Sequence, residues 1–108
     1  MSQSLWVQIE RVNATCDRRY SSEPAQDSGF TSSEVGRLFL ALQREYGRCV
    51  SKVYVDRRDG EALPIGWVFH KRREYERGEG TYLDEVWVTV SLEPKPVRPV
   101  RIDRMEEV

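Results

Sequence analysis

Two apolar runs flanking a short charged segment constrain the fold of this chain more than any other feature. Residues 65–90 read IGWVFHKRREYERGEGTYLDEVWVTV, and Arg77-Gly78-Glu79-Gly80 lies between the runs. Apolar runs rich in valine and aromatic residues, joined by a glycine-containing turn, are typical of a β-hairpin. We therefore predict antiparallel strands over residues 65–76 and 81–93.

A two-residue loop at Gly78-Glu79 would fix the register of this hairpin. It pairs Trp67 with Val90, Phe69 with Val88, Arg73 with Asp84, Arg72 with Glu85, Tyr75 with Tyr82 and His70 with Trp87. Cross-strand pairs of opposite charge or of aromatic rings each stabilise a sheet by roughly 0.2–1 kcal/mol. The charged segment is therefore interpreted as the solvated end of a hairpin, with its arginines neutralised, and not as a free basic patch.

Residues 31–47 carry the signals of an amphipathic helix. Thr31 and Glu34 have the spacing of a capping box, and Gly47 supplies a C-terminal stop. The apolar stripe comprises Val35, Leu38, Phe39, Leu42 and Tyr46. Leu40 falls on the opposite, polar side, where it is either an ordinary exposed leucine or a contact for a partner.

Further strands are predicted at residues 5–12 and 49–57, while residues 13–30 show no periodicity and are interpreted as a mobile connector. The fold class is α+β, with one helix packed on a curved antiparallel sheet in the order strand, helix, strand, strand, strand. Residues 1–93 form a single domain. Residues 94–108 contain three prolines and form an extended tail or an edge segment.

Composition and motifs argue against several classes of function. The net charge is −1, so no overall field attracts nucleic acid or an anionic membrane. Cys16 and Cys49 lack zinc-ligand spacing and are interpreted as free thiols in a reducing cytoplasm, although a single disulfide remains an alternative. No signal peptide, membrane span or catalytic motif is apparent, so we expect no enzyme activity, no cofactor and no metal.

Aromatic residues on the sheet face away from the helix suggest a binding surface. The predicted partner-binding residues are Trp6, Tyr54, His70, Arg72 and Trp87, with Leu40 as a second candidate. A protein partner, either a second copy of the chain or another protein, fits the balanced charge best. The alternative is nucleic-acid binding through the same aromatics with Lys52, Lys71, Arg72 and Arg73. If residues 94–108 folded back over these aromatic rings, the rings would not be accessible to a partner.

One pattern carries a resemblance to a known group of proteins. Gly66-Trp67-Val68-Phe69-x-Lys71-Arg72, then Tyr75-Glu76 and Tyr82-Leu83-x-Glu85-x-Trp87-Val88-Thr89-Val90, resembles small uncharacterised proteins of actinobacteria and their phages. The resemblance covers about a quarter of the chain and implies no activity or catalytic residue. A phage gene would imply action inside a bacterial host, and hence a modulator of a host protein.

Overall fold

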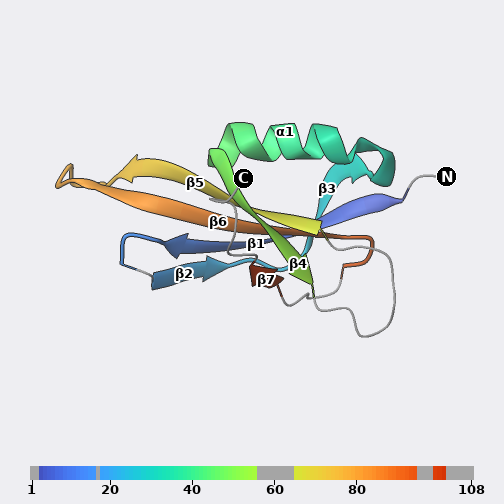
Figure 1. Ribbon diagram of the computed structural model, residues 1–108, viewed down its shortest axis with the longest axis horizontal. Helices are drawn as coiled ribbons and strands as arrows, with labels where there is room; N and C mark the ends of the chain where they lie inside the picture. Colours follow the sequence, from blue (N-terminus) through green and yellow to red (C-terminus); the bar gives the residue numbers. More distant parts are fainter. Residues whose placement is uncertain (1–2, 17, 56–64, 95–98, 102–108) are drawn as a thin grey trace.

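The computed structural model describes residues 3–16, 18–55, 65–94 and 99–101, and it shows an α+β fold in which one helix packs on an antiparallel sheet (Figure 1). The predicted fold class is confirmed. The elements in chain order are β1 (Ser4–Asn13), β2 (Arg18–Ser22), β3 (Gln26–Thr31), the 3₁₀ turn η1 (Ser32–Glu34), α1 (Val35–Tyr46), β4 (Arg48–Val55), β5 (Ile65–Glu74), β6 (Thr81–Ser91) and β7 (Pro99–Arg101).

The sheet has the strand order β2-β1-β6-β5-β4-β7, and every described pairing is antiparallel. The outer edge of β1 is shared by two strands, because residues 4–7 pair with β3 and residues 10–13 pair with β2. Figure 1 shows α1 above the sheet, with β2 and β7 on the side away from the helix. The sheet is therefore strongly curved, as predicted.

The segment 13–30, predicted as a mobile connector, instead contains β2 and β3. Their sequences, RRYSS and QDSGFT, are mostly polar and show no alternation. Such sequences become strands because β1 offers them an unpaired edge, and sheet formation depends more on this context than on intrinsic propensity. The prediction of a loop was wrong for this reason.

The helix follows its predicted signals closely. Leu38, Leu42 and Tyr46 are buried, and Val35 and Phe39 are partly buried against the same core. The backbone N–H of Thr31 donates to the Glu34 carboxylate at 3.0 Å, which is one half of the predicted capping box. The first turn is 3₁₀ and not α, which is common at helix N-termini.

The capping interaction predicts a specific dependence of stability on pH. Hydrogen bonds from the Thr31 backbone and side chain hold the pKa of Glu34 below its ordinary value of 4.5. A lowered carboxyl pKa stabilises the folded state above the ordinary value, and this contribution is lost as the pH falls through the lowered one. We expect wild type to unfold at higher urea than Glu34→Gln at neutral pH, and the gap to close in acid. Glu45→Gln, at the other end of α1, controls for net charge, and a pH-independent gap would contradict the prediction.

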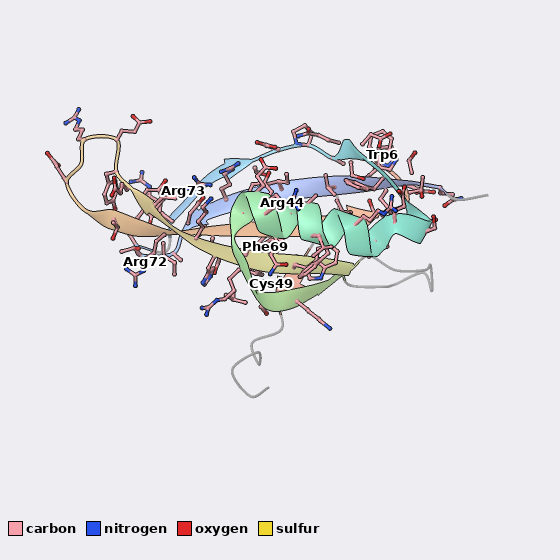
Figure 2. The ribbon with its side chains drawn as sticks, turned by 90° about the horizontal axis from the view of Figure 1, so that it is seen from above. Trp6, Arg44, Cys49, Phe69, Arg72 and Arg73 are labelled. Atoms are coloured by element: carbon pink, nitrogen blue, oxygen red, sulfur yellow. The ribbon has the colours of Figure 1, made fainter. Side chains whose placement is uncertain are left out.

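The core lies between α1 and one face of the sheet. Leu5, Val7 and Ile9 of β1 contribute to it, with Trp67 and Phe69 of β5 and Val86, Val88 and Val90 of β6. Phe69 lies beneath α1 (Figure 2), and its ring packs against Phe39, Tyr46 and Trp67 with centroid separations of 5.9, 6.4 and 6.4 Å. The predicted core face is therefore correct for these three strands.

The β5–β6 hairpin has the predicted strands in a different register. Trp67 lies opposite Val88, Phe69 opposite Val86 and His70 opposite Glu85, which is a shift of two residues from the predicted pairs. The turn is longer than two residues, because Tyr75 N–H donates to Gly80 O at 3.0 Å and Gly78 N–H donates to Tyr75 O at 2.9 Å. An even shift keeps each side chain on its face, so the core survived the error while the partners of the charged residues changed.

The described part of the C-terminal segment is a strand. Residues 99–101 form β7, which pairs along the outer edge of β4. The tail was predicted to be either extended or an edge segment, and this stretch is an edge strand. It extends the sheet beside β4.

Candidate functional site

The predicted contact residues are distributed over the molecule and do not form one cluster. Trp6, His70, Arg72 and Trp87 lie on the sheet face away from α1, and Leu40 is on the outer side of the helix with 60% of its surface exposed. In the ladder, Trp6 is opposite Ser91 and Trp87 is opposite Glu10, so the two indoles are four residues apart, about 13 Å along the strands. Figure 2 shows Trp6 and Arg72 toward opposite ends of the sheet.

The face away from the helix is less exposed than the alternation suggested. Val68, Ser51, Thr89 and Glu85 on this face are buried, and Trp6, His70 and Trp87 are half-buried. Arg72 is exposed. The expectation of an exposed aromatic face is therefore wrong for the middle of the sheet, where these side chains are buried or half-buried.

A β-bulge changes the face assignment of β4. The register shifts between Cys49 and Ser51, so that Cys49 lies opposite Phe69 but Ser51 lies opposite Val68 and Lys52 lies opposite Trp67. One extra residue moves every following side chain to the other face. Lys52 therefore shares the face of Trp67, contrary to the prediction. The side chain of Tyr54 lies outside the described part of the structure.

On the face away from the helix, a buried carboxylate joins two of the predicted residues. Glu85 accepts a hydrogen bond from Trp87 Nε1 through Oε2 at 2.7 Å, and its Oε1 lies 2.7 Å from His70 Nε2. Since an ionised carboxylate only accepts, the His70 nitrogen that faces it carries the proton. Glu85 was predicted to neutralise Arg72, but the register instead places it opposite His70. The carboxylate fixes the orientation of both rings.

On the helix side, Asp84 is the second buried carboxylate, with a side chain only 1% exposed. Its Oδ2 lies 2.9 Å from Arg73 Nε and 3.8 Å from Arg11 Nη1. The Arg11 guanidinium also stacks over the Tyr46 ring at 5.3 Å from its centroid, and burial raises the pKa of Tyr46. The predicted Arg73–Asp84 contact is confirmed. It arises diagonally, because Asp84 lies directly opposite Lys71.

We expect Asp84→Asn to lower the free energy of unfolding by about 1–2 kcal/mol, because it removes the charge that Arg73 and Arg11 share. A fully buried pair would cost about 3–5 kcal/mol to break, but the two arginine side chains are 36% and 27% exposed and regain water. Urea denaturation measures the difference. Glu79→Gln, at the exposed hairpin tip, is the matched control, and its free energy of unfolding should stay close to that of wild type. If Asp84→Asn were as stable as wild type, the contacts of Asp84 with Arg73 and Arg11 would make no net contribution to stability.

A groove lies where the ends of two hairpins meet, and we call it the hairpin-end groove. The turn after β1 is held against β6, because Ala14 N–H donates to Leu83 O at 2.8 Å and Leu83 N–H donates to the Thr15 hydroxyl at 2.7 Å. The lining residues are Asn13, Cys16, Arg18, Glu74, Tyr75, Glu76, Arg77, Glu79 and Tyr82. Neither this groove nor a role for Cys16 in it was predicted from the sequence.

Two tyrosines form the aromatic part of the hairpin-end groove. The rings of Tyr75 and Tyr82 pack with centroids 5.0 Å apart, which confirms their predicted contact, and Tyr75 is 43% exposed. Figure 1 shows the β5–β6 hairpin extending past the end of α1. The tyrosines are therefore displayed on the most projecting end of the described structure.

Metal and thiol chemistry find little support in the described residues. Within those ranges no three His, Cys, Asp or Glu side chains gather into a metal-binding group. Cys16 is exposed and Cys49 is partly buried, and both are free thiols. Burial raises the pKa of Cys49. A higher thiol pKa lowers the fraction of reactive thiolate, so Cys49 is suited to packing and not to nucleophilic chemistry.

Comparisons with known proteins give no further guide. No protein-family model matches the chain, and neither a curated protein nor a solved structure matches it. Of the helices in the described ranges, none combines the length and apolar character required to cross a bilayer.

Proposed function

We propose that this chain is a noncatalytic protein-interaction module that binds its partner through the hairpin-end groove. The supporting observation is the exposed Tyr75 packed on Tyr82 at the end of a projecting hairpin. Tyrosine is enriched among the residues that dominate protein interfaces, since it offers a large, rigid ring at a small cost in conformational entropy. The groove adds carboxylates and arginines around the rings, as in the polar rim of an interface.

Two features of the chain bear on the class of partner: its sequence resemblance and its free thiols. The resemblance to actinobacterial and phage proteins supports a modulator of a bacterial host protein, and a second copy of the chain would be a self-associating partner. The free thiols of Cys16 and Cys49 are consistent with work in a reducing cytoplasm. Trp6, Arg72, Trp87 and Leu40 remain candidate contacts outside the groove, at separate places on the molecule, because each has exposed or half-exposed surface.

A matched pair of variants tests the proposed groove. Tyr75→Ala should keep the melting temperature close to that of wild type, because the ring is largely at the surface, yet lose a specific protein that wild type captures from a bacterial lysate. Arg44→Ala, on the outer side of α1, should capture that protein normally. Equal capture by Tyr75→Ala and wild type would exclude the groove as the contact surface.

Self-association has its own readout. Sedimentation of wild type at two concentrations should show a concentration-dependent mass if the partner is a second copy, and Tyr75→Ala should then remain monomeric. A wild-type chain that is monomeric at both concentrations leaves a different protein as the proposed partner.

Nucleic-acid binding remains a second candidate because one lysine and one arginine side chain are accessible to phosphate groups. Lys71 and Arg72 are exposed and make no ion pair among the described residues. Arg73, in contrast, is engaged by Asp84. Binding to single-stranded oligonucleotides should weaken steeply with salt if phosphates are the target, and the absence of any gel shift at low salt would remove this candidate.

A further inference from the structure

His70 lies between two arginines on the sheet face away from α1. Arg48 of β4 is directly opposite His70, and Arg72 is two residues further along β5 on the same face. Opposed residues on neighbouring strands have Cβ atoms about 5 Å apart, and alternate residues of one strand are about 7 Å apart. Two arginines that can each donate to an anion therefore lie on either side of His70, on one short stretch of the sheet.

Both arginines are available for a ligand. The side chains of Arg48 and Arg72 are exposed, and neither makes an ion pair or hydrogen bond among the described residues. Arg37 and Arg73, in contrast, are paired with Glu34 and Asp84. This availability follows from the observed register, because Glu85 lies opposite His70 and not opposite Arg72.

The buried Glu85 carboxylate holds the His70 ring in place between the two arginines. It holds the Nε2 side of the ring, so the other ring nitrogen, Nδ1, is left without a partner among the described residues. A carboxylate on one ring nitrogen fixes the orientation of the ring. The charge of Glu85 is itself engaged by His70 and Trp87.

We infer that Arg48 and Arg72, on either side of His70, form a binding site for one phosphate group, either inorganic phosphate or the phosphate of a small monoester. A planar guanidinium donates two parallel hydrogen bonds to phosphate oxygens, and two arginines together carry the charge that balances a dianion. Glu74, two residues beyond Arg72 on the same face and exposed, is the nearby acid that opposes binding. This site is separate from the hairpin-end tyrosines and does not depend on the proposed protein partner.

The chain contains a single histidine, which makes the test direct. Nuclear magnetic resonance of the His70 ring, recorded during titration with inorganic phosphate at constant pH and ionic strength, should show a saturable shift that potassium chloride does not produce. Arg48→Gln and Arg72→Gln should each weaken the apparent affinity about tenfold, because each removes charged hydrogen bonds. Arg44→Gln, on α1, should leave it unchanged.

A variant that is expected to bind phosphate more tightly controls for a general loss of structure. Glu74→Gln should tighten phosphate binding about two- to threefold, because it removes the opposing charge. If glycerol phosphate binds more tightly than inorganic phosphate, the natural ligand is a monoester, and equal affinity indicates the free ion. A non-saturable shift, or affinities unchanged in both arginine variants, would overturn the site. So would a response to a single-stranded oligonucleotide without any to inorganic phosphate, since the surface would then be specific for a polymer.

Discussion

Replacing Gly47 with alanine is expected to lower the free energy of unfolding by about 3 kcal/mol or more. Gly47 ends α1 with φ of 105°, a conformation that residues with a Cβ atom rarely adopt. A Cβ placed there would lie 2.3 Å from the carbonyl oxygen of His70 and 2.9 Å from Cβ of Lys71. The backbone of β5 would have to move to make room.

A second glycine of the helical segment provides the control. Gly36 lies in the first turn of α1, and a Cβ there would meet nothing within 4 Å. Gly36→Ala should stabilise the protein by about 0.5–1 kcal/mol, since alanine favours the helix. Urea and thermal denaturation measure both variants, and the Gly47→Ala melting temperature should fall by at least ~10 °C. A Gly47→Ala protein as stable as wild type would show that the junction between α1 and β4 is not tightly packed.

Truncation of the central aromatic ring is the second large effect. Phe69 is fully buried under α1 and touches three other aromatic rings. Phe69→Ala should cost about 3–5 kcal/mol through lost burial and a residual cavity. Because domains are typically stable by only about 5–15 kcal/mol, this variant should be close to unfolding at ambient temperature.

Two further variants define how the Phe69 result is interpreted. Phe69→Leu keeps much of the side-chain volume and should lose clearly less stability than Phe69→Ala. Leu40→Ala removes an exposed leucine of α1 and should stay within about 0.5 kcal/mol of wild type. If Leu40→Ala destabilised the protein as much as Phe69→Ala, Leu40 would pack in the core and not lie on the outer side of α1.

The helix and the core face could be predicted because their signals are local and redundant. The apolar stripe of α1, the Thr31–Glu34 spacing and Gly47 each indicate the same helix, and the structure contains it. Alternation in β5 and β6 depends on the pleat of each strand alone, so it survives an error of two residues in their pairing.

The turn of the hairpin explains the failure in register. The sequence Arg77-Gly78-Glu79-Gly80 allows more than one loop, and the observed one has positive φ at Gly78 (69°) and Gly80 (122°). A loop built on a type I turn, followed by a left-handed glycine, is longer than the two-residue loop that was predicted. Turn residues alone do not separate these possibilities, because glycine is compatible with both.

The remaining differences between prediction and structure arise from contacts between segments that are distant in the sequence. No residue near Cys49 and Ser51 marks the bulge in the sequence, although the register of β4 shifts there. Likewise, β2 and β3 form only because β1 presents an edge. The candidate sites depend on exactly these features: the hairpin-end groove needs the turn before β2, and the Arg48–His70–Arg72 site needs the true registers of β4, β5 and β6. His70 and Arg72 could therefore be predicted individually from the sequence, but Arg48 could not.

The position of β1 in the sheet has a consequence for how the chain folds during synthesis. Among the described strands β1 is synthesised before the others, yet its inner neighbour is β6, with Val7 opposite Val90. At about 5–20 residues per second, translation delays that pairing by roughly 4–16 s. The local pairings with β2 and β3 form sooner, but they leave Leu5, Val7 and Ile9 without their final apolar neighbours. Nascent chains halted before β6 should therefore be targets for chaperones and proteases.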